Sequence, residues 1–412
     1  MINRQPPCRK TGEPSCRKAF ILTERMVFTT MAKLELIATA TFGLEAVVKR
    51  EIEDLGYRIL RSEDAKITFL GNESAIVRSN LWLRCADRVL LKMGEFQALT
   101  FTELFEQTKA LPWEEWIPLE GKFTVSATSV KSALFSVPDC QSIVKKAIVE
   151  KLKETYPVDF FPETGPEYPV KLTLLKDRAT LTIDTSGQGL HKRGYRVRDV
   201  AAPIKETLAA AMIKLSFWHP DRLLVDPFCG SGTIPIEAAM IGLNIAPGLS
   251  RSFASQKWEQ LSPALWKKEK AEAFSSIRND VSLSLMGYDI DPKAVAAAVD
   301  NAAQAGLSED IRFRRLPFEK LDISRDYGII ITNPPYGKRI GTQPALQEIY
   351  RALGAFFQKR PTWSLYLITA DRDFEKNFLP RPADRRRKLY NGRLETTFFQ
   401  YYGEKPPKTP RP

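Results

Sequence analysis

The sequence predicts an α/β protein whose C-terminal half folds as a Rossmann-like sheet of seven strands, preceded by smaller α+β units. Five apolar segments from residue 223 onward alternate with helical segments, which is typical of a doubly wound parallel sheet. Two more strand-like segments flank Asn391 and Gly392, a dipeptide that favours a hairpin turn. The seven segments are residues 223–228, 284–289, 311–316, 327–333, 364–369, 386–391 and 395–402.

The composition is that of an ordinary globular protein with an excess of positive charge. Of the 412 residues, 43% are hydrophobic and 27% are charged, and the formal net charge is +12. Such a basic balance indicates an anionic partner, most often nucleic acid. The five cysteines form no CxxC pair and only two histidines occur, so neither a disulfide framework nor a zinc site is expected. We expect no bound metal, no membrane-spanning segment and a reducing cytoplasmic compartment.

Residues 1–30 differ in character from the rest of the chain. They are basic, contain prolines and show no hydrophobic period, and they lack an apolar run long enough for a signal peptide. We expect this extension to lack fixed structure. Met31 immediately precedes a well-patterned segment, so the extension is either a genuine addition or a misplaced start. An organellar transit peptide is disfavoured by the acidic residues Glu13 and Glu24.

Residues 31–95 are predicted to form a small α+β unit of the ferredoxin-like type. Leu44, Val47 and Val48 recur at helical spacing in an amphipathic segment that Gly56 ends. Trp82 and Leu83 are interpreted as core residues. The expected elements are a strand at 33–40, a helix at 43–56, strand material at 57–71, and a helix followed by a strand at 75–96.

Residues 96–190 are predicted to form a second unit with the order helix, strand, helix, strand, strand. The final two strands form a hairpin with Lys176 and Asp177 at its turn. Basic residues then crowd the junction that follows, where Lys192, Arg193, Arg196 and Arg198 are candidate contacts to a phosphate backbone.

The first strand of the C-terminal sheet leads into a glycine-rich turn, LLVDPFCGSGT at residues 223–233. Glycine tolerates positive φ and lets the backbone approach a ligand closely. No lysine follows the glycines and no GxGxxG is present, so neither a phosphate-binding loop nor a dinucleotide fingerprint fits. An acid at the strand end suits a ligand with a positive centre and an amine, such as S-adenosylmethionine. The candidate binding residues are Asp226, Phe228, Gly230, Gly232 and Thr233, although an ordinary strand-to-helix turn would look similar.

Two further strand ends strengthen the ligand interpretation. Asp289 ends the second strand, where a carboxylate can accept both hydroxyls of a ribose, and Ile290 follows it. Asn333, Pro334, Pro335 and Tyr336 follow the fourth strand. The Asn333 side-chain oxygen and the Pro334 carbonyl can each accept one N–H of an amine whose lone pair is delocalised into a nucleobase. The prolines fix these acceptors before substrate arrives, and Tyr336 offers a face for an extruded base.

The NPPY sequence after a glycine turn and a strand-tip acid resembles the class I S-adenosylmethionine-dependent methyltransferases that act on exocyclic amines. The order of elements in residues 96–190 resembles a THUMP domain, an RNA-binding module. The words HKRGYR and APIKETLAAA at 191–196 and 202–211 resemble the bacterial THUMP-containing guanine-N2 methyltransferases of 23S ribosomal RNA. The likeness runs from about residue 31 to about residue 403.

This resemblance implies S-adenosylmethionine as cofactor, RNA as partner, and RNA contacts from the basic junction and from Lys338. It implies that Ile290 packs on the adenine of the cofactor. The expected division is an extension at 1–30, a ferredoxin-like domain at 31–95, a THUMP domain at 96–190 and a methyltransferase domain at 191–405.

Two departures from the general methyltransferase pattern are visible. An added stretch at 247–281 is rich in aromatic and basic residues, and is either a lid, an RNA contact or a segment whose Phe253 and Trp258 pack against the protein. Leu316, Pro317 and Phe318 stand where many methyltransferases carry an acid for the adenine amine. We therefore assign no side chain to that amine.

Other functions stay open at this point. Transfer RNA instead of ribosomal RNA is the nearest alternative substrate. A DNA or protein amine methyltransferase would share NPPY, but the N-terminal units favour RNA. A non-catalytic RNA-binding ribosome assembly factor that retains the cofactor fold is the alternative from a different class.

Overall fold

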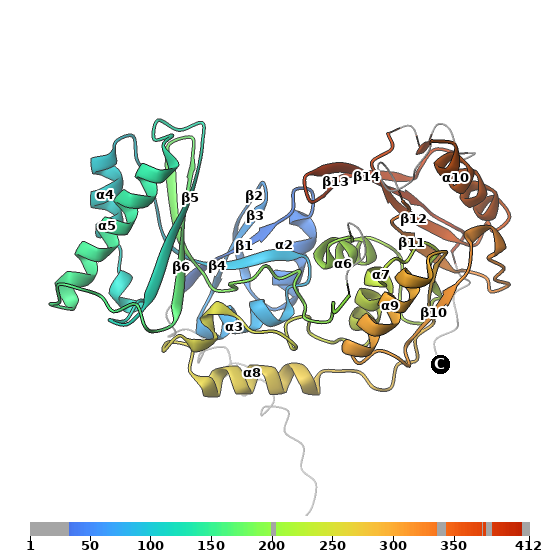
Figure 1. Cartoon of the computed structure of the whole chain (residues 1–412), viewed down its shortest axis with the longest axis horizontal. Coiled ribbons are helices and arrows are strands. Elements are labelled where there is room, and N and C mark those ends of the chain that lie inside the picture. The colour runs from blue at the N-terminus through green and yellow to red at the C-terminus, as the bar shows by residue number, and fades with distance from the viewer. Residues whose placement is uncertain (1–32, 199–202, 336–342, 373, 376–380, 406–412) are drawn as a thin grey trace, which may run out of the picture.

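The computed structural model describes residues 33–198, 203–335, 343–372, 374–375 and 381–405. The expected extension at 1–30, Tyr336 and Lys338 lie outside these residues. The described chain forms two sheets (Figure 1). Within the described residues, no helix is both long and apolar enough to span a bilayer.

The N-terminal sheet has the strand order β2-β3-β1-β4-β7-β6-β5. One long strand, β4, joins the two predicted N-terminal units, because it pairs with β1 on one side and with β7 on the other. The two units therefore share one continuous sheet. In chain order the elements are β1 (Leu34–Ala40), α2 (Glu45–Asp54), β2 (Arg58–Glu63), β3 (Lys66–Gly71), α3 (Glu73–Trp82), β4 (Ala86–Gln97), α4 (Phe101–Lys109), η1 (Trp113–Glu115), β5 (Lys122–Val130), α5 (Val137–Thr155), β6 (Glu167–Leu175) and β7 (Arg178–Asp184).

Local sequence explains where several of these elements begin and end. Thr100 and Glu103 form a capping box that starts α4, and each of their side chains accepts a backbone N–H at the helix start. Gly56 follows α2 with φ +87°, as its sequence position predicts. The predicted turn between β6 and β7 is confirmed, since Lys176 and Asp177 both adopt positive φ (51° and 63°).

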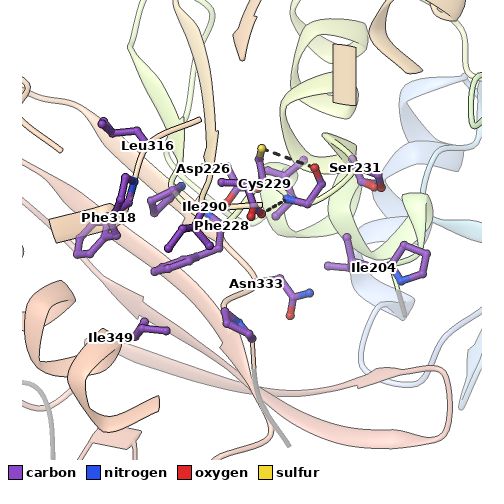
Figure 2. Close-up of a pocket in the computed structure, with 18 of the residues that line it drawn as sticks. Ile204, Asp226, Phe228, Cys229, Ser231, Ile290, Leu316, Phe318, Asn333 and Ile349 are labelled. Carbon is purple, nitrogen blue, oxygen red and sulfur yellow. Dashed lines mark hydrogen bonds between the residues drawn. The ribbon is translucent and has the colours of Figure 1, made fainter. Parts of the chain in front are cut away.

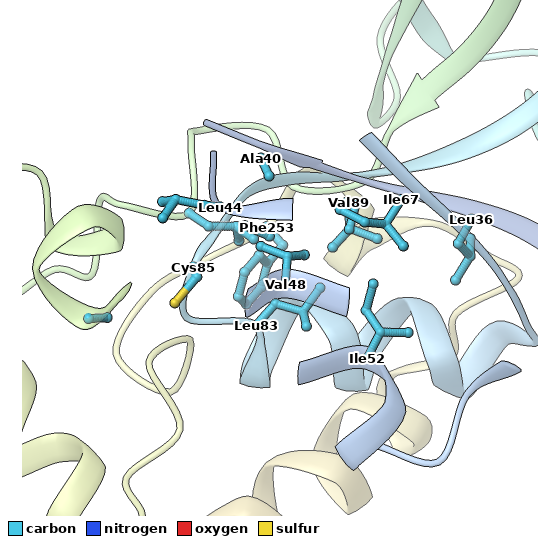
Figure 3. Close-up of a cluster of buried hydrophobic side chains, with 14 of the residues drawn as sticks. Leu36, Ala40, Leu44, Val48, Ile52, Ile67, Leu83, Cys85, Val89 and Phe253 are labelled. Atoms are coloured by element: carbon cyan, nitrogen blue, oxygen red, sulfur yellow. The ribbon is translucent and has the colours of Figure 1, made fainter. Parts of the chain in front are cut away.

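The core of the first unit receives a side chain from the C-terminal half. Leu44 and Val48 of the predicted amphipathic helix are buried there together with Leu83. Figure 3 shows that Phe253, from the added stretch at 247–281, lies among these residues. The prediction of Leu83 as a core residue is confirmed, and Trp82 is partly buried against the same core. The two halves of the chain are thus packed as one body at this point.

The C-terminal sheet confirms all seven predicted strands, in the order β10-β9-β8-β11-β12-β14-β13. The first five are parallel to one another and the last two form the antiparallel hairpin. Its elements are α6 (Glu206–Lys214), β8 (Leu224–Asp226), α7 (Thr233–Gly242), η2 (Ala254–Lys257), α8 (Pro263–Ser275), β9 (Leu285–Asp289), α9 (Pro292–Gln304), β10 (Ile311–Arg315), η3 (Phe318–Lys320), β11 (Ile329–Thr332), α10 (Gln343–Gln358), β12 (Ser364–Thr369), β13 (Arg385–Asn391) and β14 (Leu394–Tyr401).

The predicted hairpin turn is displaced by one residue. Asn391 still belongs to β13 and pairs with Leu394, so that Gly392 and Arg393 form the turn. Gly392 has φ +66°, which supplies the left-handed conformation that such turns need.

The stretch at 247–281 attaches the C-terminal half to the N-terminal sheet. The Trp258 ring stacks on Tyr168 of β6 with centroids 4.8 Å apart, and its indole N–H donates to the Glu167 carbonyl (2.9 Å). Helix α8 packs beside α3, where the Ser74 hydroxyl donates to Glu269 (2.6 Å). Of the possibilities raised for this stretch, packing against the protein is what the structure shows for Phe253 and Trp258.

Candidate active site

A cavity of about 510 Å³ opens at the carboxyl ends of β8, β9 and β11 (Figure 2). Parallel α/β sheets bind their ligands at this edge. The cavity brings together eight of the eleven residues predicted to bind the cofactor or to take part in the chemistry. They are Asp226, Phe228, Gly230, Thr233, Asp289, Ile290, Asn333 and Pro335. Below, the part formed by Asp226, the turn at 230–233, Asp289 and Ile290 is termed the glycine-turn end. The part around Asn333 is termed the Asn333 end.

The glycine turn owes its shape to two residues with positive φ. Gly230 has φ +53° and Gly232 has φ +81°, and Gly232 directly precedes α7. A Cβ at Gly232 would lie 2.9 Å from Phe313 Cζ and 3.0 Å from Ala298 Cβ. Side chains from β10 and α9 therefore leave room only for glycine at this position.

Asp226, at the end of β8, is almost wholly buried. The Thr332 hydroxyl donates to its Oδ1 (2.7 Å), and the Phe228 N–H donates to the same oxygen (3.2 Å). Burial raises the pKa of the Asp226 carboxyl to about 7, against an ordinary value of 3.8. A carboxyl with this pKa can lose its proton when a cationic group comes close.

Asp289 ties the glycine turn to the loop after β9. Its Oδ2 accepts the Gly230 N–H (2.9 Å) and its Oδ1 accepts the Asp291 N–H (2.9 Å). Each carboxylate oxygen has a further lone pair, so a ligand hydroxyl can still be accepted. The two predicted strand-tip acids thus lie at one end of one cavity.

Apolar side chains form a slot beside Asp289. Ile290 is 64% exposed, which is unusual for an isoleucine, and it lines the cavity together with Leu316 and Phe318. Figure 2 shows these side chains at the end of the cavity that lies away from Ile204. A flat aromatic group such as adenine fits an apolar slot of this kind.

Asn333 follows β11 and lines the same cavity. Its Oδ1 is buried, yet it accepts no hydrogen bond from the described residues. An unsatisfied buried acceptor costs about 1–3 kcal/mol, so this oxygen marks a position where an N–H donor from a ligand would be stabilised.

The basic junction divides into surface and interior residues. Lys192 and Arg198 are exposed, and Arg198 forms an ion pair with Asp300 (2.9 Å). Arg193 is only 3% exposed; its Nε donates to Glu237 Oε1 (3.2 Å), and its Nη2 donates to the Arg84 carbonyl (2.6 Å). A guanidinium that is buried and paired in this way cannot reach a phosphate, so the predicted RNA contact of Arg193 is wrong.

Arg196 also points inward, toward the glycine turn. Its guanidinium donates to the hydroxyls of Ser231 (2.9 Å) and Thr233 (3.0 Å), and it pairs with Glu206 (2.8 Å). Arg196 of the basic junction therefore stabilises the glycine turn through these hydrogen bonds. The sequence had suggested Arg196 only as a phosphate contact.

Sequence reasoning missed several residues of this site. Thr332 holds Asp226 although it reads as an ordinary strand residue, and Ser231 was not singled out within the turn. Glu237 carried a usable signal, because it is the one acid in the otherwise apolar helix segment at 233–242. A lone acid in a buried helix requires a buried partner, and Arg193 is that partner.

Comparison with known proteins agrees with this architecture domain by domain. Residues 35–90 match the RlmL ferredoxin-like domain, residues 98–184 match the THUMP domain, and residues 193–400 match the RMKL-like methyltransferase domain. The chain belongs to the RMKL-like methyltransferase family.

Relatives of this methyltransferase are similar over most of the chain. YpsC of Bacillus subtilis (strain 168), named as a candidate RNA methyltransferase, is 49% identical over 380 residues, which cover 92% of this chain and 98% of YpsC. The ribosomal RNA large subunit methyltransferase K/L of Syntrophotalea carbinolica is 36% identical over 388 residues. That alignment covers 90% of this chain but only 54% of the relative, which is a longer protein.

Solved structures with the same fold carry descriptions that name different activities. The crystal structure of SMU.472, described as a candidate methyltransferase complexed with SAH, has a TM-score of 0.87 and 44% identity, and covers 91% of this chain and 99% of that one. A structure from Listeria monocytogenes, described as a predicted N6-adenine-specific DNA methylase, has a TM-score of 0.87 and 48% identity, and covers 92% and 98%.

Methyltransferases of this class use S-adenosylmethionine, and the residues of the cavity fit that cofactor. Asp226 and the glycine turn would hold its amino acid part, Asp289 its ribose, and the slot at Ile290 its adenine. When bound, S-adenosylmethionine supplies an electrophilic methyl group.

Proposed function

We propose that this protein transfers a methyl group from S-adenosylmethionine to the exocyclic N2 amine of a guanine in RNA, with 23S ribosomal RNA as the substrate. The observation that carries the proposal is the buried Oδ1 of Asn333, which accepts no hydrogen bond from the part of the chain that the structure describes and lies in the cavity that also contains Asp226 and Asp289. Asn333 Oδ1 can accept a hydrogen bond from an N–H group of a substrate that lies beside the bound methyl donor. An uncharged amino group on a nucleobase is a substrate of this kind.

The chain's own residues have a simple part in this reaction. An amino group on a nucleobase is a weak nucleophile because its lone pair is delocalised into the ring. Asn333 Oδ1 and the Pro334 carbonyl would accept its two N–H bonds, which turns the lone pair toward the methyl group. The amine becomes acidic only after it is methylated, so its proton can leave to water and no general base is needed.

Several features support RNA as the substrate. YpsC is named for RNA and the K/L enzyme for ribosomal RNA, and a THUMP domain precedes the methyltransferase domain here as well. The net charge of +12 favours a polyanion, and Lys192 and Arg198 are exposed. The three described cysteines are free, which is consistent with the cytoplasm as the place of action.

The test is methyl transfer from labelled S-adenosylmethionine to unmodified ribosomal RNA and, separately, to unmodified transfer RNA, followed by nucleoside mass analysis. N2-methylguanosine in ribosomal RNA is the expected product. N2-methylguanosine in transfer RNA alone would support the proposed reaction but contradict ribosomal RNA as the substrate. N6-methyladenosine as the product would contradict guanine as the methylated base. Cofactor binding without any product would favour the non-catalytic RNA-binding assembly factor.

A further inference from the structure

A second cavity of about 450 Å³ lies where the N-terminal sheet meets the β13–β14 hairpin. Its walls come from three parts of the chain that are distant in sequence. The lining residues are Thr41, Phe42, Asp87, Lys205, Tyr390 and Gly392. The reaction described above uses none of these residues.

The walls of this cavity are held together by close backbone contacts. Gly43 has φ +91°, and a Cβ there would lie 2.7 Å from the Lys388 carbonyl oxygen of β13. The Arg387 guanidinium donates to the Gly43 carbonyl (3.2 Å). The turn after β1 therefore packs directly on β13, and the cavity is a fixed recess at a domain junction.

Phe42 and Tyr390 provide an aromatic wall. Their ring centroids are 6.0 Å apart at an interplanar angle of 78°, an edge-to-face arrangement. The Lys388 ammonium lies 5.5 Å from the Tyr390 ring centroid, whereas Phe42 remains 46% exposed. Phe42 is thus a rigidly placed aromatic ring that is open to solvent, and a nucleobase can stack on such a ring.

The charges in this cavity suit a nucleotide in one orientation. Lys205 forms no ion pair with any described residue, so its ammonium is available to a phosphate. Asp87 lies in the same cavity and accepts the Thr41 hydroxyl (3.2 Å). A carboxylate repels phosphate but accepts N–H groups from the edge of a base, so the base belongs toward Asp87 and the phosphate toward Lys205.

The second cavity adjoins the active site along the chain. Lys205 lines the second cavity, and the preceding residue Ile204 lines the first. An RNA strand that binds at the active-site cavity can therefore also reach Lys205.

We propose that the second cavity binds an unpaired nucleotide of the RNA substrate next to the methylated one, with its base stacked on Phe42 and its phosphate near Lys205. Unpaired nucleotides whose bases stack on aromatic side chains are the usual basis of RNA recognition. The proposal rests on RNA as the substrate. It makes Phe42 and Lys205 binding residues and leaves the chemistry to the Asn333 end.

The test compares Phe42→Ala with Phe42→Trp and with Phe274→Ala. Loss of one base-stacking contact should raise the KM for RNA about tenfold, with kcat and the Kd for S-adenosylmethionine unchanged. Phe42→Trp keeps a stacking face and should retain the wild-type KM. Phe274 is 71% exposed on α8, away from β13 in Figure 1, and is a matched control that should leave KM unchanged.

Two results would overturn the proposal. One is an unchanged KM for RNA in Phe42→Ala, and the other is a loss of kcat or of cofactor affinity in that variant, which would indicate a structural role. Direct binding of a short single-stranded RNA to wild type and Phe42→Ala separates this proposal from the proposed function. If RNA is never methylated but still binds more weakly to Phe42→Ala, the methyl transfer fails and the nucleotide site stands.

Discussion

The two ends of the active-site cavity differ in how their polar groups are satisfied. At the glycine-turn end, Asp226 and Asp289 each accept two hydrogen bonds from the protein itself. At the Asn333 end, the Asn333 Oδ1 is buried and receives none from the described residues. The protein therefore holds the two acids of the glycine-turn end in place by itself, whereas the Asn333 oxygen is left for a ligand to satisfy.

This difference indicates a division of labour between binding and turnover. Groups that the protein already holds in place can bind a cofactor without rearrangement. An acceptor left without a donor raises the free energy of the empty site, and a bound amine recovers that free energy while it is being oriented. Substitutions at the two ends should accordingly affect different steps.

Asn333→Ala is expected to have the largest effect. Removal of a preorganised hydrogen-bond acceptor should lower turnover by about 100-fold or more, while the affinity for S-adenosylmethionine stays unchanged. Stability should not fall, because an unsatisfied buried oxygen is removed. Single-turnover methyl transfer and thermal unfolding measure these outcomes, and an unchanged rate would exclude Asn333 from the reaction.

Asp226→Asn is expected to act on binding instead. The loss of a charged partner should weaken cofactor binding by about 1.5–3 kcal/mol, with little effect on the rate at saturating cofactor. Calorimetric titration with S-adenosylmethionine measures the change in affinity. Thr332→Ser keeps the hydroxyl that donates to Asp226 and is the matched control, so equal losses in both variants would contradict this role.

Gly232→Ala should have a smaller effect, and on stability as well as on binding. The left-handed conformation costs a residue with a Cβ about 1–2 kcal/mol, and the new Cβ would press on Phe313 and Ala298. Denaturant unfolding should show a lower midpoint. An unchanged midpoint would mean that the glycine turn can rearrange. It would then count against the claim that the protein holds the glycine-turn end in place by itself.

The last expected effect is the release of a proton linked to Asp226. Its pKa in the native state is about 7 and its ordinary value is 3.8, so the native state binds more protons between these values. Stability from this group therefore falls as pH rises from about 4 to about 7. The ammonium group of the cofactor should lower the pKa of Asp226 and release up to one proton on binding near pH 6.5. Titration in two buffers of different ionisation enthalpy detects this release, and Asp226→Asn should abolish it.

Much of the fold was predictable because the hydrophobic pattern and the turn residues agree. Local sequence predicted the seven strands of the C-terminal sheet and the hairpin turn at Lys176 and Asp177. It also predicted that Asp226, Asp289 and Asn333 lie at strand ends. The edge where parallel strands end then brings the strand tips together.

What could not be predicted depends on contacts between distant segments. A basic run such as residues 192–198 has the same composition whether a side chain faces solvent or the interior. Only the fold shows that Arg193 meets Glu237 and that Arg196 meets Ser231. Likewise, the sharing of β4 by both N-terminal units and the insertion of Phe253 into their core leave no local pattern.

The most direct test of the division between the two ends is the single-turnover rate as a function of S-adenosylmethionine concentration, measured for Asn333→Ala and Asp226→Asn side by side. We expect Asn333→Ala to keep the wild-type half-saturating concentration and to lose the maximal rate. Asp226→Asn should raise the half-saturating concentration and keep the maximal rate. If both variants lose affinity and rate to the same extent, the two ends do not act separately and the account is contradicted.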